Sequence, residues 1–181
     1  MTIKLTAKKV LALVARETGD RNKINLSGAN LNGLDLSRAD LARLRLLETD
    51  LSGANLSQAN LEGTNLRQAK LGQAYLQLAM LSWANLSWAY LRQANLGEAD
   101  LSDADLRWAT LRGANLENTD LHRADLRDIN LEAANLRHAN LRGANLRRAN
   151  LYKANLELVD YDQFTEWPEG INPASLAIRA F

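Results

Sequence analysis

The feature that most constrains this chain is a leucine at every fifth position, from Leu26 to Leu156, 27 times in succession without a slip. An α-helix turns a side chain by about 140° over five residues, so these leucines would point in all directions around its axis. In a flat strand the odd spacing would send successive leucines to opposite faces. Either element would leave many leucines in water, so the chain must bend once in every pentad to keep them on one side.

The residues around each leucine indicate how the pentad is used. Alanine stands two positions before the leucine in 20 of the 26 pentads from Ala29 to Ala154. Asn or Asp stands immediately before the central position in 22 of 28 cases from Asn25 to Asp160, the last of which precedes Tyr161. Residues two apart share a face of an extended segment, so alanine and leucine are both predicted to point inward, with the small alanine near a corner. Asn and Asp suit the bend, because their side chains hydrogen-bond to nearby backbone and tolerate unusual dihedral angles. The other positions are predicted to face solvent.

The pentads 54–58 (Ala-Asn-Leu-Ser-Gln) and 144–148 (Ala-Asn-Leu-Arg-Arg) resemble those of the pentapeptide-repeat family, and the resemblance extends over residues 24–160. It implies an all-β fold, a right-handed quadrilateral β-helix in which four pentads make one coil. The 27 pentads would then form about seven coils. Family members also use Phe at the central position, whereas this chain has leucine throughout.

The two ends of such a coil would expose unpaired backbone and apolar core, so we expect a cap at each end. Residues 7–18 read as an amphipathic helix that stops at Gly19, which makes 1–23 an N-terminal capping helix and lead-in. Residues 161–181 are the predicted C-terminal cap, where Asn172 and Pro173 would begin a short helix that continues through Ala180. The flanks 19–21 and 165–170 resemble those of pentapeptide-repeat proteins from cyanobacteria.

Composition excludes several classes of function. The absence of Cys excludes a disulfide scaffold, a thiolate metal site and a cysteine nucleophile. With 22 Lys and Arg against 21 Asp and Glu, the net charge of +1 gives no electrostatic case for direct binding to nucleic acid or to an anionic membrane. The apolar run 10–15 is short for a signal peptide and is closed by Arg16 and Glu17. We therefore expect a cytoplasmic protein that does not enter a membrane.

The sequence offers no catalytic or metal-binding group. The serines that follow central leucines, such as Ser87, are predicted to lie on the outer surface. His122 and His138 are 16 residues apart and would fall on different faces of a 20-residue coil. Asp100 would lie over Asp120, but both occupy the Asn/Asp position and are predicted to bond to their turns. We predict no catalytic residues, no metal, no cofactor and no enzymatic activity.

Exposed aromatic residues provide the candidate binding site. None of the six aromatic residues between 24 and 160 is at an inward position, and five of them fall between 75 and 108. Trp88 and Trp108 differ by 20, so we expect them to stack in neighbouring coils. Trp, Tyr and Arg are enriched at binding hot spots, and a contiguous exposed apolar patch often marks an interaction site. The predicted partner-binding residues are Trp83, Trp88, Tyr90, Arg107, Trp108 and Arg112. The alternative is that the aromatic residues only stiffen the coil.

Stacking by 20 residues should also pair opposite charges between coils, such as Asp128 with Arg148, and make most of the surface charge self-complementary. One column, Arg107, Arg127 and Arg147, breaks this pattern.

These observations favour a non-enzymatic scaffold, monomeric or dimeric, that binds a protein partner through the aromatic residues. The family resemblance implies an alternative, a DNA-mimic-type modulator of a type II topoisomerase, although such mimics are strongly acidic rods. A carbohydrate-acting β-helix enzyme is a third class, for which the sequence supplies no convincing acid/base cluster.

Overall fold

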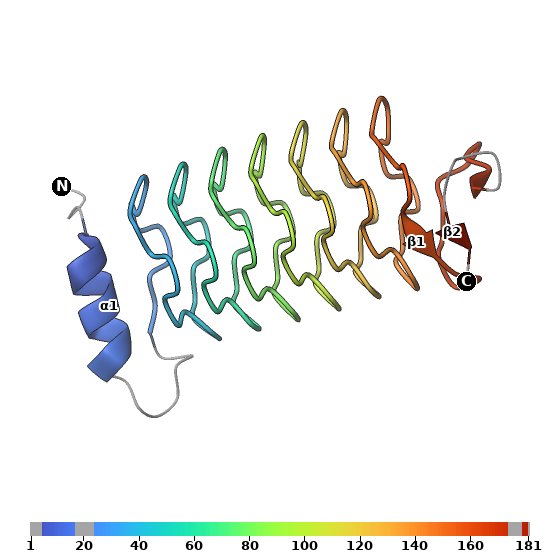
Figure 1. Ribbon diagram of the computed structural model, residues 1–181. Coiled ribbons are helices and arrows are strands. Elements are labelled where there is room, and N and C mark those ends of the chain that lie inside the picture. Colours follow the sequence, from blue (N-terminus) through green and yellow to red (C-terminus); the bar gives the residue numbers. More distant parts are fainter. Residues whose placement is uncertain (1–4, 17–23, 174–178, 181) are drawn as a thin grey trace.

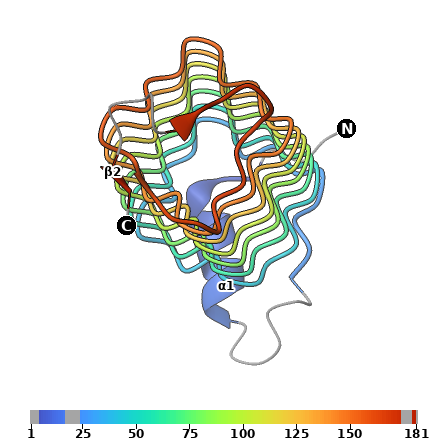
Figure 2. The same ribbon diagram turned by 90° about the vertical axis from the view of Figure 1, so that its right-hand side faces the viewer.

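The computed structural model describes residues 5–16, 24–173 and 179–180. The chain winds into a rod of stacked coils, with α1 (Ala7–Arg16) beside the first coil and the short strands β1 (Asp160–Tyr161) and β2 (Arg179–Ala180) at the other end (Figure 1). Parallel bridges join residues 20 apart, from Asn25 with Arg45 to Asn140 with Asp160. One coil therefore takes four pentads, and successive coils superpose around a common axis (Figure 2).

Backbone hydrogen bonds between coils repeat in every pentad. The N–H of a central leucine donates to the carbonyl 19 residues later, as from Leu56 to Tyr75 (2.7 Å). The N–H of the preceding Asn or Asp donates to the carbonyl 21 residues earlier, as from Asn55 to Leu34 (2.9 Å). Each coil thus satisfies the backbone of its neighbours, which an isolated pentad could not do for itself.

The bends are turns with one residue in the left-handed region. The alanine N–H donates to the carbonyl of the preceding leucine, as from Ala59 to Leu56 (3.0 Å). The second residue after each central leucine, from Gly28 to Leu158, has φ between +55° and +69°, as a type II turn requires. Asn and Asp were expected to take the unusual dihedral angles, and this prediction is wrong: they sit in the bridges.

The predicted side-chain hydrogen bonds of Asn and Asp are confirmed. From Asn25 to Asn155 each accepts the backbone N–H two residues later, as Asn55 does from Ser57 (3.1 Å). Asn side chains also form ladders between coils, with Asn135 Nδ2 donating to Asn115 Oδ1 (3.1 Å) and Asn155 Nδ2 to Asn135 Oδ1 (3.2 Å). The Asn/Asp position therefore closes the following turn and joins one coil to the next.

The core is a column of leucines lined at its corners by alanines. From Leu31 to Leu146 every central leucine is at most 1% exposed. The inward alanines from Ala54 to Ala144 are equally buried, and Thr64 and Thr119 take the same place at 0% exposure. This arrangement confirms the predicted inward positions. The main outward positions are the two residues that follow each central leucine, which we call the first and second corner residues.

The two ends differ in part from expectation. Helix α1 ends at Arg16, and Val10 and Val14 belong to the same buried cluster as the leucines. The predicted stop at Gly19 lies outside the described residues. At the other end, Arg179 and Ala180 form β2 and pair with β1, so the predicted helix through Ala180 is wrong for these two residues, and most of the remainder lies outside the described ranges. No helix among the described residues is long and apolar enough to cross a membrane.

Candidate partner-binding surface

Trp88 and Trp108 form a stacked pair on one corner of the rod. Both are the second corner residue of a pentad, with φ of +62° and +58°, and they lie one coil apart. Their ring centroids are 5.0 Å apart and the planes are inclined by 15°, as the 20-residue spacing predicts. The residues remain 47% and 41% exposed, because their corner points away from the leucine column.

Arg107 lies against this pair. Its Cζ is 5.2 Å from the centroid of the Trp108 ring, a distance that permits a cation–π interaction. Its Nε and one terminal nitrogen donate to the two carboxylate oxygens of Asp105, at 2.9 and 2.8 Å. Burial raises the pKa of Asp105, but hydrogen bonds from the Arg107 side chain and backbone outweigh it and leave the pKa below its ordinary value. The guanidinium is thus held in one position beside the exposed indole.

The other predicted binding residues do not join this cluster. Trp83, which is 62% exposed, is on the preceding corner of the same coil. Tyr90 is on the next face, where it forms one bridge with Lys70 and another with Thr110. Arg112 is on the following corner, where it pairs with Glu132 (3.2 Å). The exposed Tyr75, Leu78 and Met80 lie on the corner and faces before Trp83. Among the six predicted residues, direct ring contacts join Trp88, Trp108 and Arg107, and the other three lie on neighbouring corners and faces.

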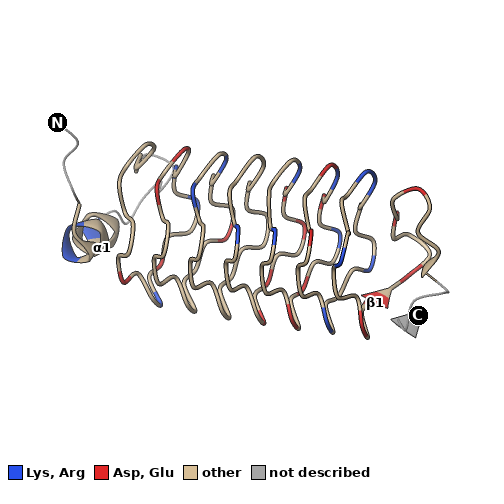
Figure 3. Ribbon diagram, turned by 90° about the horizontal axis from the view of Figure 1, so that it is seen from above, with Lys and Arg blue, Asp and Glu red and all other residues tan. Residues whose placement is uncertain are grey.

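The arginine column is neutralised by acids in flanking columns. Arg127 pairs with Asp125 (2.5 Å), just as Arg107 pairs with Asp105, and Arg147 lies 2.8 Å from Glu166. The column thus departs from the stacked pairing of opposite charges, as expected, but its charge is compensated by acids outside the column. Predicted pairs between coils also form, including Arg123 with Asp103 (3.1 Å) and Arg148 with Asp128 (2.6 Å). Figure 3 shows basic and acidic residues interspersed along the rod.

The side chains considered for catalysis have ordinary structural surroundings. Ser87 is only 5% exposed, which corrects its predicted place on the outer surface, and its hydroxyl donates to Asn85 Oδ1 (2.7 Å). Asp120 accepts the His122 backbone N–H (2.9 Å), as a turn-bonding residue should. Among the described residues, no three His, Asp or Glu side chains gather as a metal site would require.

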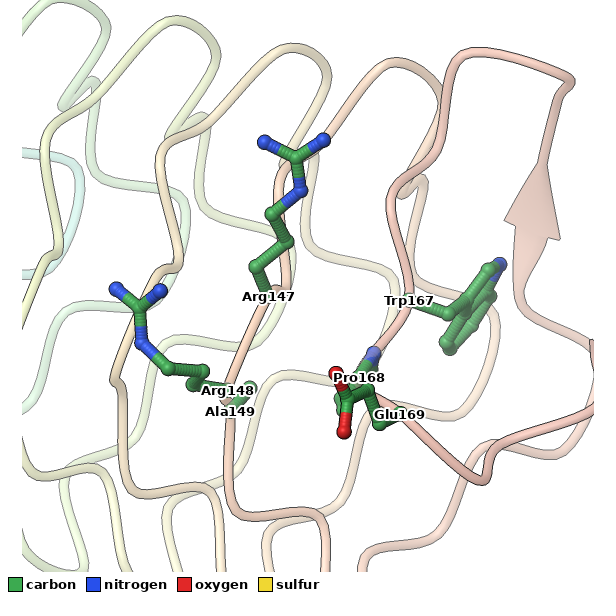
Figure 4. Close-up of a pocket in the computed structure, with 6 residues that line it drawn as sticks. All are labelled: Arg147, Arg148, Ala149, Trp167, Pro168 and Glu169. Carbon is green, nitrogen blue, oxygen red and sulfur yellow. The ribbon is translucent and has the colours of Figure 1, made fainter.

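A hollow of about 550 Å³ lies at the C-terminal end, and we did not predict it from the sequence. Figure 4 shows Arg147, Arg148 and Ala149 on one side of it and Trp167, Pro168 and Glu169 on the other. The bridge from Asn145 reaches Glu166 after 21 residues instead of 20, so the chain gains one residue just before the hollow. The sequence signal that could have predicted this irregular end is the loss of the five-residue period after residue 160, followed by Pro168.

A family model for pentapeptide repeats matches residues 22–58, 59–97, 89–128, 99–137 and 124–160. A similar solved structure is that of AT2G44920, a pentapeptide repeat protein from the thylakoid lumen of Arabidopsis thaliana. It is 30% identical, with 54% of this chain and 68% of that chain covered and a TM-score of 0.52. Together these similarities imply that the β-helix is right-handed.

Two further structures are similar over most of the chain. HetL, a pentapeptide repeat protein involved in heterocyst differentiation regulation in the cyanobacterium Nostoc sp. strain PCC 7120, is 31% identical, with 86% of this chain and 96% of that chain covered and a TM-score of 0.26. QnrB1, a plasmid-mediated fluoroquinolone resistance protein, is 16% identical, with 90% and 86% covered and a TM-score of 0.49. No curated protein sequence matches the chain.

Proposed function

Because the chain belongs to the pentapeptide-repeat family, we propose that it is a non-enzymatic scaffold that binds a protein partner through the surface of its β-helix. The repeats of this chain build a rod whose interior is filled by leucine and alanine, so its specificity has to reside in the outward residues. Most outward charges of the C-terminal half are already paired, which leaves exposed apolar side chains as the groups with most to gain from a partner.

The observation that carries this proposal is the exposed stack of Trp88 and Trp108 with Arg107 at its side. A large aromatic side chain loses little rotamer freedom when it binds, and Trp and Arg are the most enriched hot-spot residues. The bidentate bond to Asp105 orients Arg107 before any partner arrives, which lowers the entropy cost of binding.

The experiment that tests this proposal compares a double Trp→Ala variant of the stack with a single Trp→Ala variant outside it. Trp88→Ala with Trp108→Ala removes the stack, whereas Trp83→Ala removes an indole from the equivalent position of the preceding corner. We expect the double variant to lose at least about 2 kcal/mol of binding, some thirtyfold in affinity, to a partner captured from the host with wild-type protein. Trp83→Ala should keep both affinity and melting temperature close to wild type.

A purely structural role would give a different result. The two rings lie outside the leucine column, so their removal should cost only about 0.5–1.5 kcal/mol of stability. A lowered melting temperature with unchanged capture would mean that the stack merely stiffens the coil, and the scaffold proposal would lose the observation on which it rests.

The alternative, a DNA-mimic-type modulator of a type II topoisomerase, has weaker support. A net charge of +1 with interspersed acids and bases does not resemble the phosphate charge of a duplex. A gyrase supercoiling assay separates the two functions: the scaffold proposal expects no effect of the purified protein, and concentration-dependent inhibition or protection would favour the mimic.

Our proposal includes the finer organisation of the chain. Residues 24–160 would form about seven coils, with 1–23 and 161–181 as the capping segments, and the burial of Val10 and Val14 supports the first of these roles. The protein would act in the cytoplasm as a monomer or a dimer, without a cofactor.

A further inference from the structure

The hollow at the C-terminal end begins where the pairing of coils stops. At this corner in earlier coils, the N–H of the second corner residue donates to the next coil: Trp88 to Arg107 (2.9 Å), Trp108 to Arg127 (3.2 Å) and Asp128 to Arg147 (3.1 Å). The series ends at Arg148, whose N–H has no acceptor among the described residues.

The local sequence explains this loss. Leu146 still donates to Glu166 (2.7 Å), so with the extra residue the acceptor for Arg148 should be the carbonyl of Pro168. That carbonyl instead accepts the N–H of Ile171 (3.3 Å), because the chain turns away at 169–170, where Gly170 has a φ of +80°. The last corner and the departing chain are therefore separated by a gap with an unpaired backbone donor on its wall.

The walls of the hollow are about equally polar and apolar, and two of its residues are arginines. The guanidinium of Arg148 is bound by Asp128, with both nitrogen–oxygen distances below 2.8 Å, and that of Arg147 lies 2.8 Å from Glu166. In Figure 4 both groups point away from the space between the two sides. Their aliphatic stems remain at the hollow, opposite Pro168, whereas the Trp167 ring extends away from the arginines and packs against Tyr161, with ring centroids 5.7 Å apart.

Glu169 supplies the one uncompensated charge of the hollow. Its carboxylate points toward the side that carries Arg148 and Ala149 (Figure 4), and within the described part of the chain no basic group lies within 4.0 Å of it. The two arginines with Asp128 and Glu166 sum to zero, so Glu169 makes the hollow anionic by one charge.

We propose that this hollow binds a lysine or arginine side chain of a partner polypeptide. The apolar part of the walls matches the methylene stem, and the Glu169 carboxylate matches the cation. The peptide carbonyl next to the basic residue accepts the free N–H of Arg148, which replaces the bond that the coil lacks here. The site lies on the same corner as Trp88 and Trp108, two coils beyond Trp108, and contains neither of these residues.

The test is a titration followed by the amide resonances of Arg148 and Ala149 and the indole resonance of Trp167. The probes are the blocked peptides acetyl-Gly-Gly-Lys-Gly-Gly-amide and its norleucine and glutamate counterparts, which keep the length but change the charge. We expect the lysine peptide to shift these resonances saturably, with a Kd of about a millimolar, and to bind about threefold to fivefold more tightly than norleucine.

Variants locate the interaction. Glu169→Gln should reduce binding of the lysine peptide by the same factor, whereas Glu48→Gln, an exposed carboxylate near the other end of the same corner, should leave it unchanged. The Trp88 and Trp108 double variant should also bind normally, so failure here is distinguishable from failure of the scaffold proposal. Equal binding of lysine and norleucine, tighter binding of glutamate, or no saturable shift would each overturn the proposal.

Discussion

The hydroxyl of Thr119 donates a hydrogen bond to the carbonyl of Leu96, 2.9 Å away and inside the coil. Thr64 makes the equivalent bond to Leu41, also 23 residues earlier (3.0 Å). These threonines occupy the inward corner position that is alanine in most pentads. A buried hydroxyl is tolerated there because the preceding coil presents an acceptor at bonding distance, so no water is needed.

Thr119→Val tests the worth of this bond. Valine keeps the shape of threonine but lacks the hydroxyl. The Leu96 carbonyl still accepts the N–H of Ala99 (3.0 Å), so the substitution leaves no buried polar group without a hydrogen bond. We expect the free energy of unfolding, measured by urea titration, to fall by about 1 kcal/mol. Thr110→Val, at an outward bridge position, should be nearly silent. A loss above about 3 kcal/mol at residue 119 would contradict this account.

Gly53 and Gly72 should respond oppositely to alanine. Gly53 has φ of +63° and no atom within 4 Å of an added Cβ, so Gly53→Ala should cost about 1 kcal/mol through backbone strain alone. Gly72 lacks a positive φ, and its added Cβ would lie an ordinary 3.7 Å from the Arg92 carbonyl. Gly72→Ala should therefore leave stability unchanged or raise it by about 0.4–1 kcal/mol. Equal shifts in melting temperature would refute the assignment of the strained position.

Ala104→Leu tests the space at the inward corner. Ala104 is 1% exposed, and leucine would force extra atoms against the leucine column, so we expect a loss of about 1–3 kcal/mol in unfolding free energy. Arg92→Leu introduces the same residue at an exposed corner position and should change stability by less than about 0.5 kcal/mol. Similar losses at both sites would mean that the corner tolerates bulk.

Asp128 should make stability depend on pH in the acid range. The hydrogen bonds from Arg148 hold the pKa of Asp128 below its ordinary value of 3.8. A carboxylate with a depressed pKa stabilises the fold fully above about pH 4, and this contribution is lost as the pH falls through the lowered value. Asp128→Asn should therefore flatten the fall in unfolding free energy below pH 4 and leave its slope near neutrality unchanged. An unaltered acid profile would show that the pair contributes nothing.

The inward residues could be predicted from the sequence because burial and local geometry repeat with the same period. A leucine every five residues, with alanine two positions earlier, is compatible with burial only if the chain bends once in each pentad. The stack of Trp88 on Trp108 and the pair of Asp128 with Arg148 followed once the coil length was taken as 20. These contacts depend on one sequence separation alone.

Contacts between columns were decided by the tertiary structure. Arg107 and Arg127 look like an uncompensated column in the sequence, yet Asp105 and Asp125 neutralise them, because a long arginine side chain reaches back two residues to the adjacent face. The left-handed residue also lies at the second corner position and not at Asn or Asp, since the turn closes from the leucine carbonyl to the alanine N–H. Trp83 and Tyr90 lie on a different corner and face from Trp88, because the chain bends once in every pentad.

The sequence by itself determined that the chain coils, which residues enter the core and, with the coil length, which residues stack along the rod. The tertiary structure decided which neighbouring columns touch and what happens where the period ends, after residue 160. An extra residue before Glu166 shifts the register, and the Pro168 carbonyl binds Ile171 instead of Arg148, so a hollow replaces a corner. The packing within the repeat can be predicted from the repeat itself, because each pentad packs against other pentads of the same pattern. The residues after 160 pack against the last coil without sharing its pattern, so their contacts cannot be predicted from the repeat.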